Sequence, residues 1–150
     1  MNSLYNNEYV KTKIKDKFNI EISTVKLIGI GYDSEAYLIN NEFIFKFAKH
    51  KLACKDYVRE KRILDFLKEN LKTNIKIPVI EYFNNTNDSA IIGYRAINGT
   101  FLSPTVYKKM NDIQKRKLVE DISEFLKKLH SLNVEGIIKY TTDNRVRMYR

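Results

Sequence analysis

The chain has 150 residues, of which 43% are hydrophobic and 30% charged, a balance typical of a globular protein rather than a disordered one. Its single cysteine, Cys54, excludes an internal disulfide and suits a reducing compartment, and the sequence contains no apolar run long enough to span a membrane. We therefore expect a cytoplasmic protein with one well-formed core, or a small domain with an appended helical piece.

The formal net charge of +9 raises the question of nucleic-acid binding. The 27 lysines and arginines are scattered, however, and fall mostly on the polar faces of predicted helices. Dispersed charge of this kind is typical of a solvated surface, so we expect neither nucleic acid nor a membrane as partner. A small basic nucleic-acid-binding protein stays an alternative, which binding that collapses steeply with salt would identify.

The chain opens with a predicted helix and a short strand. Over Glu8–Phe18, an apolar stripe at helical spacing is formed by Val10, Ile14 and Phe18. The next segment, Ile20–Ser23, alternates apolar and polar residues and predicts a short edge strand.

Three strand-like runs follow, at Val25–Ile30, Ala36–Asn40 and Glu42–Phe47. The first link is a turn at Gly29 and Gly31. The second link is Asn40-Asn41, a pair that tolerates positive φ. We expect an antiparallel meander.

A helix is predicted over Lys55–Leu71, and it separates this meander from two more strands. Its apolar stripe consists of Tyr57, Leu64, Leu67 and Leu71. Glu60 lies on the same stripe. The later strands are Val79–Phe83 and Ala90–Ile97, around a polar loop, and the second is apolar on both faces and therefore central.

The remaining pattern is helical. Ser103-Pro104 is a helix start, and Asn111 with Gln114 resembles a capping box. The long helix that follows has one apolar face: Leu118, Ile122, Phe125, Leu126, Leu129 and Leu132. We therefore predict an α+β fold, a five-stranded antiparallel sheet with a helix inserted between its third and fourth strands, followed by helices.

The Gly29/Gly31 turn is the first candidate for chemistry. Phosphate oxygens need backbone N–H donors at close range, and glycine lets the chain approach without a Cβ in the way. Asp33 and Ser34 lie just beyond the turn. A plain hairpin explains this turn alone about as well.

Lys46 is the second candidate. It shares a strand face with Ile44 and Ala48, while three phenylalanines take the other face. A lysine flanked by apolar residues needs a counter-charge, and Glu60 is the obvious partner. An edge strand with a solvated lysine is the alternative, but the order of turn, lysine and helix carboxylate favours an ammonium aimed at a nucleotide.

Five segments carry a resemblance to a known family: residues 28–40, 41–50, 59–64, 93–99 and 125–133. In this order and spacing they are similar to the aminoglycoside phosphotransferases, and most to the 2''-phosphotransferase subgroup, which are bacterial resistance kinases with a protein-kinase-like fold. The resemblance covers Val25 to Gly136. It implies a nucleotide-binding first lobe over residues 1–98, and over residues 99–150 a linker and the first helices of a second lobe.

The resemblance also implies roles for individual residues. Lys46 would contact the nucleotide phosphates, and Glu60 would orient it. Tyr94 would stand at the back of the base pocket. Three side chains would sandwich the base and ribose: Ile28, Ile30 and Ile44. Backbone groups of Arg95 and Ile97 would hydrogen-bond the purine, and Ala96 between them would also belong to the nucleotide site. The preference for ATP or GTP stays open.

No His-x-Asp or Asp-Phe-Gly-like segment follows before Arg150, so we predict no catalytic residue and no metal ligand in this chain. The family's catalytic loop, its metal-binding residues and its acidic pocket for the cationic drug would lie in a missing half, which would account for the charge of +9. We expect the N-terminal portion of a kinase that phosphorylates an aminoglycoside with ATP or GTP. Mg²⁺ would bind in the intact enzyme only, and this chain alone would not turn over.

Two alternatives stay open. The chain could be a non-catalytic module that binds a nucleotide or a partner, or part of a kinase for another small alcohol such as choline or homoserine. In each case the apolar face of Gln114–Leu132 lacks a second lobe to bury it. We expect that helix to pack against another copy, to fold back on the first lobe or to be poorly ordered.

Overall fold

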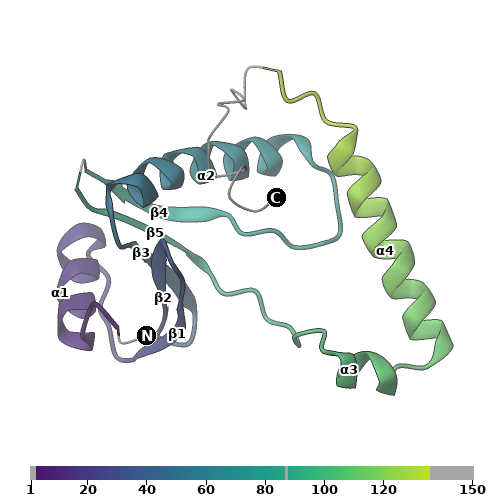
Figure 1. Cartoon of the computed structure of the whole chain (residues 1–150), viewed down its shortest axis with the longest axis horizontal. Helices are drawn as coiled ribbons and strands as arrows, with labels where there is room; N and C mark the ends of the chain where they lie inside the picture. Colours follow the sequence, from purple (N-terminus) through teal and green to yellow (C-terminus); the bar gives the residue numbers. More distant parts are fainter. Residues whose placement is uncertain (1–2, 87, 136–150) are drawn as a thin grey trace.

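The computed structural model describes residues 3–86 and 88–135. In chain order its elements are α1 (Asn7–Phe18), β1 (Val25–Ile30), β2 (Ser34–Ile39), β3 (Phe43–Ala48), α2 (Lys51–Asn70), β4 (Ile80–Asn85), β5 (Ala90–Arg95), α3 (Pro104–Lys109) and α4 (Asp112–His130). The five strands form one antiparallel sheet in the order β1-β2-β3-β5-β4 (Figure 1). The predicted α+β fold is confirmed. The end of the predicted second unit, residues 136–150, lies outside the described residues.

The two faces of the sheet carry separate cores, because successive side chains of a strand point to opposite faces. On the face covered by α1, called the α1 face, Phe43, Phe45 and Phe47 of β3 pack with Val10 and Ile14. On the opposite face, called the α2 face, a smaller buried cluster lies under α2: Ala48, Ala53, Cys54, Tyr57, Ile80, Ala90 and Ile92. α2 packs against β3, β4 and β5.

The segment that joins α1 to β1 is not a strand, so the prediction of an edge strand at Ile20–Ser23 is wrong. The side chain of Asn40 satisfies its backbone instead. The N–H groups of Ser23 and Thr24 donate to Asn40 Oδ1 at 2.8 and 3.2 Å, and Asn40 Nδ2 donates to the Glu21 carbonyl at 2.9 Å. Asn40 and its neighbour Asn41 both have φ of 54°, which confirms the turn predicted there.

The inserted helix α2 begins at Lys51 rather than at the predicted Lys55. The reason is the cap, because the Ala53 N–H donates to His50 Nδ1 at 3.2 Å and satisfies one of the free donors of the first turn. Asn70 ends the helix, one residue before the predicted end.

β5 lies between β3 and β4 and is buried over residues 90–93, which confirms that it is a central strand. Gly93 allows this packing, since a Cβ at that position would collide with the Phe45 ring. The strand ends at Arg95 rather than at Ile97.

Beyond β5 an extended segment leads to α3 and α4, which stand apart from the sheet (Figure 1). Both predicted helix starts are confirmed: Ser103 caps α3, and Asn111 forms a full capping box with Gln114 at the start of α4. Among the described residues no helix combines the length and the apolar character that crossing a membrane requires.

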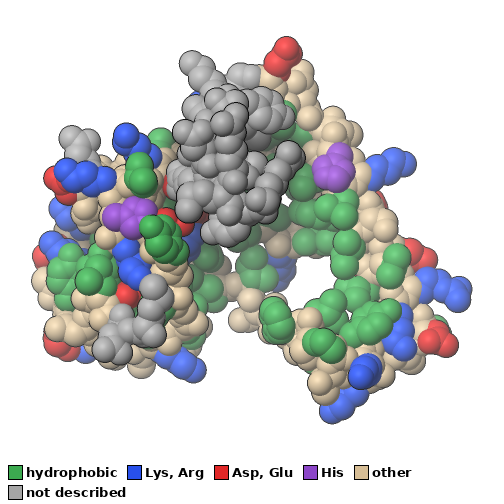
Figure 2. All heavy atoms as spheres, in the orientation of Figure 1, with side chains coloured by type: hydrophobic (Ala, Val, Ile, Leu, Met, Phe, Trp, Pro, Cys, Tyr) green, Lys and Arg blue, Asp and Glu red, His purple; other side chains and the backbone are tan. Residues whose placement is uncertain are grey.

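α4 is a regular helix with no buried residue. Hydrophobic side chains gather along α3 and α4 (Figure 2), and Ile113 is 80% exposed. The helix is ordered and does not fold back on the sheet, and it approaches the first lobe at the loop of residues 73–75. Association with another copy stays a prediction.

Candidate functional site

The site begins with a pair of opposite charges between β3 and α2. Lys46 Nζ donates to both Glu60 carboxylate oxygens at 2.9 Å. The side chains are only 22% and 34% exposed, respectively, so the pair lies at the border between the core and solvent. The counter-charge predicted for Lys46 is confirmed. Its ammonium is held in one place while part of it stays accessible.

A buried tyrosine completes the surroundings of this ammonium. Lys46 Nζ lies 5.1 Å from the centre of the Tyr57 ring, and Tyr57 is 3% exposed. Burial raises the pKa of Tyr57, and the neighbouring Ser34 hydroxyl opposes that shift. The Ser34 hydroxyl lies beside the buried Tyr57 hydroxyl, but within the described part of the chain the geometry gives the Tyr57 hydroxyl no hydrogen bond of ordinary length and angle.

Strand register shows which side chains share the face of Lys46, because residues directly opposite in antiparallel strands lie on the same face. The register pairs join Lys46 to Ala36 and Ala36 to Gly29. They also join Ile44 to Leu38 and to Tyr94. Like Lys46, the other five residues named in these pairs are only partly buried. We call them the open half of the α2 face: Gly29, Ala36, Leu38, Ile44 and Tyr94.

Tyr94 is electrostatically linked to the charged pair. Burial raises the pKa of its hydroxyl, and the nearby carboxylate of Glu60 raises it further. The phenol is therefore neutral over the physiological range and presents a hydrogen-bond donor.

Of the two β1 isoleucines predicted to contact a base, Ile30 lies on the other face of the sheet, and a base contact by Ile28 stays a prediction. Ile30 pairs with Glu35 across β1 and β2, which places it on the α1 face and away from Lys46, so the prediction that it lies against the base is not supported. The pairing of β1 with β2 is irregular between Leu27 and Gly29, and this irregularity changes which residues of β1 lie on each face of the sheet. Ile28 falls in this irregularity and is 45% exposed. Ala36, rather than Ile30, shares the face of Lys46.

The glycine turn is held by the end of β3. The Gly31 N–H donates to the Ser34 carbonyl at 2.8 Å, so this amide is engaged within the turn. Lys49 Nζ donates to the Gly31 carbonyl at 3.1 Å, and the Lys49 N–H donates to the Asp33 carbonyl at 2.9 Å. A Cβ at Gly29 would meet no atom within 4 Å, so the chain is open there. The turn is thus preformed, with free space at Gly29.

Asp33 turns toward the start of α2. Its Oδ1 lies 3.0 Å from His50 Nε2, an ion-pairing distance, although the angles do not make a hydrogen bond. Since His50 also caps α2, the two residues tie the glycine turn to the helix that carries Glu60.

The segment predicted to hydrogen-bond a purine leaves β5 beside this site. The Arg95 side chain pairs with Glu42, and its guanidinium lies 4.9 Å from the Phe43 ring centre. The Ala96 N–H donates to the Glu42 carbonyl at 2.8 Å, and Ile97 is 43% exposed. A role for the backbone of this segment stays a prediction.

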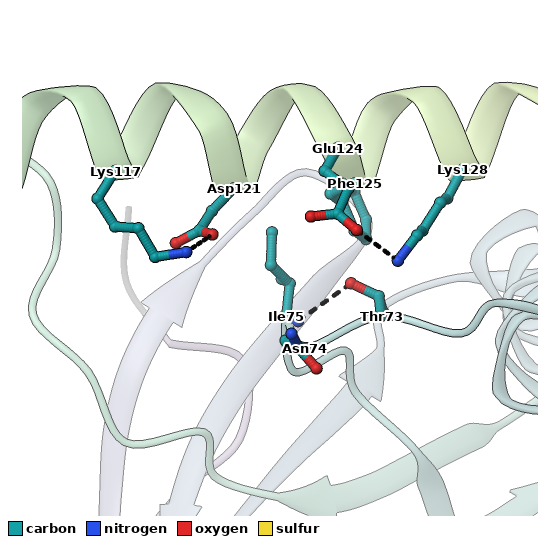
Figure 3. Close-up of a pocket in the computed structure, with 8 residues that line it drawn as sticks. All are labelled: Thr73, Asn74, Ile75, Lys117, Asp121, Glu124, Phe125 and Lys128. Carbon is teal, nitrogen blue, oxygen red and sulfur yellow. Dashed lines mark hydrogen bonds and ion pairs between the residues drawn. The ribbon is translucent and has the colours of Figure 1, made fainter.

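A cavity of about 270 Å³ lies between α4 and the loop at residues 73–75 (Figure 3). Its charged side chains pair with one another: Lys117 with Asp121 at 2.6 Å, and Lys128 with Glu124 at 2.7 Å. They leave no unbalanced charge for a ligand. Over residues 3–86 and 88–135, no group of three or more His, Cys, Asp or Glu side chains could hold a metal ion.

Sequence reasoning missed Tyr57, Ala36 and Leu38 as site residues. Tyr57 was assigned only to the apolar stripe of its helix. Its spacing of one turn from Glu60 is the signal that could have found it, since residues three apart share a helix face. The period of two along β2 could likewise have placed Ala36 and Leu38 together.

Comparison with known proteins identifies the family. Residues 24–145 match the phosphotransferase enzyme family. The chain belongs to this family.

Solved structures extend the likeness. The GDP complex of aminoglycoside 2'-phosphotransferase-IIIa shares 25% identity at a TM-score of 0.79, over 97% of this chain and 50% of that one. The GDP and kanamycin complex of APH(2")-IIia shares 23% identity at a TM-score of 0.78, over 93% and 48%. The streptomycin-ATP-APH(2")-IIa ternary complex shares 23% identity at a TM-score of 0.74, over 91% and 44%. The resemblance to aminoglycoside phosphotransferases is thereby confirmed, and this phosphotransferase-family chain spans about half the length of these proteins.

Proposed function

We propose that this chain is the N-terminal, nucleotide-binding portion of an aminoglycoside-type phosphotransferase, and that ATP or GTP binds at the open half of the α2 face. In this proposal residues 1–98 form the nucleotide-binding lobe, and residues 99–150 are the linker and first helices of a second lobe. The observation that carries the proposal is the partly exposed Lys46–Glu60 pair on a face that the helices leave uncovered.

Lys46 and the residues of the open half would contact different parts of the nucleotide. The Lys46 ammonium, with three donors of which Glu60 takes two, would bind phosphate oxygens. Gly29 leaves room for phosphates beside the turn. Ile44 and Ala36 would flank the base, with Tyr94 behind it. Glu60 would keep Lys46 charged and aimed, because an adjacent carboxylate favours the ammonium form.

In the intact enzyme the reaction would transfer the γ-phosphoryl group of ATP or GTP to an aminoglycoside hydroxyl, and so confer antibiotic resistance. Support comes from the nucleotides and aminoglycosides named in the complexes of similar proteins. Among the described residues no group of three or more His, Cys, Asp or Glu side chains could hold a metal ion, and Mg²⁺ is expected to bind in the intact enzyme only. Lys46 supplies the positive charge on this side of the phosphates, and this chain alone is expected not to turn over.

Calorimetric titration with ATP and with GTP, each with Mg²⁺, tests the proposal. We expect saturable binding to the unsubstituted chain and a loss of at least about tenfold in affinity in Lys46→Ala, since a charge-assisted contact to phosphate is removed. Lys17→Ala is the matched control, because it removes the same charge from an exposed position on α1. No binding by a folded chain, or equal binding by Lys46→Ala, contradicts the proposal.

A further inference from the structure

The Tyr57 ring gives the Lys46 ammonium a second fixed neighbour besides the Glu60 carboxylate. Lysine has a flexible four-carbon stem, and one carboxylate leaves that stem several conformations. An ammonium near the face of an aromatic ring is attracted by the ring's electron distribution within about 6 Å of its centre. The observed 5.1 Å lies inside that range.

Packing fixes the position of the ring itself. Tyr57 is 3% exposed and belongs to the buried cluster under α2, together with Ala53 and Ile92. Tyr57 and Glu60 also lie one turn apart on α2, so both contacts to Lys46 come from one rigid helix. A displacement of α2 would therefore move the ring and the carboxylate together.

The contact between Tyr57 and the Lys46 ammonium does not involve the Tyr57 hydroxyl. That hydroxyl is buried and makes no hydrogen bond of ordinary length and angle among the described residues, while Ser34 lies beside it. The Lys46 ammonium lies over the ring, 5.1 Å from its centre, so the contact is one with the ring.

We propose that Tyr57 is a positioning residue for nucleotide phosphates: its ring, acting with Glu60, holds the Lys46 ammonium toward the open half of the α2 face. This inference rests on the proposed function. It goes beyond that function in assigning the aim of Lys46 to an aromatic side chain that itself touches no nucleotide.

The test compares the affinity for a triphosphate with that for its nucleoside, because only the triphosphate engages Lys46. ATP and adenosine, then GTP and guanosine, are titrated into the full 150-residue chain and its variants. Tyr57→Phe keeps the ring and is expected to bind all four as the unsubstituted chain does. Tyr57→Leu is expected to lose about three- to tenfold in triphosphate affinity, with nucleoside affinity unchanged.

Tyr82→Leu is the matched control, since it removes a partly buried aromatic ring that packs against the core of the α1 face, with the Tyr82 and Phe45 ring centres 5.4 Å apart. It should lower the melting temperature and leave the ratio of triphosphate to nucleoside affinity unchanged. Triphosphate binding by Tyr57→Leu equal to that of the unsubstituted chain overturns the inference, as does an equal loss for triphosphate and nucleoside. Absence of triphosphate binding by the unsubstituted chain overturns the proposed function, and this inference with it.

A second measurement does not depend on whether Tyr57→Leu folds. In the unsubstituted chain, proton NMR should show the Lys46 ε-methylene signals shifted upfield by the ring, and ATP should move them while adenosine should not. Unshifted signals, or signals that adenosine moves as ATP does, overturn the inference.

Discussion

The two faces of the sheet are made by the same strands and differ in how completely they are covered. On the α1 face the side chains of Tyr37, Ile39 and Phe45 are at most 1% exposed. On the α2 face the helix packs on β3, β4 and β5, and Ile44 and Tyr94 stay partly exposed. The α1 face therefore supplies stability, while the open half of the α2 face has surface left for a ligand.

The charged residues of the two faces differ in the same way. Glu35, on the α1 face, is fully buried, and its carboxylate accepts hydrogen bonds from Ser3 Oγ, the N–H groups of Leu4 and Tyr5, and the Tyr37 hydroxyl. Burial together with the Glu35 hydrogen bond raises the pKa of Tyr37 to about 12. The hydrogen-bonding capacity of the Glu35 carboxylate is therefore used by groups of the protein itself. Lys46 keeps partial access to solvent, as a group that meets a ligand must.

The largest expected difference between the faces is in the stability lost when neighbouring residues of β3 are replaced by alanine. Phe45→Ala should lower the free energy of unfolding by about 3–5 kcal/mol, because it leaves a cavity in the α1-face core. Ile44→Ala should cost about 1 kcal/mol, since its side chain is only partly buried, but it should weaken nucleotide binding. Urea denaturation of both variants measures the contrast. Equal losses of stability would show that the α2 face is as closed as the α1 face.

Glu35 gives the next largest effect. Glu35→Gln should destabilise the chain by about 1–3 kcal/mol, because an amide N–H₂ would face donors that the carboxylate now satisfies. Burial opposes the charge of Glu35, but its hydrogen bonds outweigh burial and lower its pKa.

The lowered pKa also sets a direction for pH dependence. The charged form of Glu35 adds stability above the unfolded-state pKa of about 4.3, and that contribution is lost as the pH falls through the folded-state value. Urea midpoints measured from pH 7 downward should therefore decline more steeply for the unsubstituted chain than for Glu35→Gln. Parallel curves would mean that Glu35 is not the group responsible.

The smallest effect is expected at His50, which caps the start of α2. His50→Ala removes the cap of α2 and the contact with Asp33, and should cost about 1 kcal/mol. His50→Asn supplies another capping oxygen and should recover most of that loss. Thermal unfolding of the pair measures it, and an alanine variant as stable as the asparagine variant would exclude the capping role.

Much of the fold was predictable because short-range patterns determine it. The alternation of β3 separates three phenylalanines from Lys46, and helical spacing places Glu60 opposite that lysine. The caps at Ser103 and Asn111 follow from residues beside the helices. Each of these features depends on spacing within one element.

Two predictions failed where the pattern within one element does not decide the structure: in one case a side chain from a distant segment decides it, and in the other an irregularity of the backbone pairing does. Asn40 binds the backbone of residues 21–24 and prevents the predicted edge strand. A β-bulge before Gly29 shifts the alternation of β1, which moves Ile30 to the α1 face. The sequence pattern within a strand shows neither a contact with a distant segment nor a shift in strand pairing. Which residues make up the open half of the α2 face could therefore be assigned only from the structure.

The most direct test of the central claim is a backbone amide NMR titration of the full chain with ATP and with GTP. We predict saturable shifts at Gly29, Ala36, Ile44, Lys46 and Tyr94, and unchanged signals for the α1-face residues Val10, Ile14 and Tyr82. Shifts confined to the α1 face or to α3 and α4, or none from a folded chain, would contradict the assignment of the open half of the α2 face as the nucleotide site.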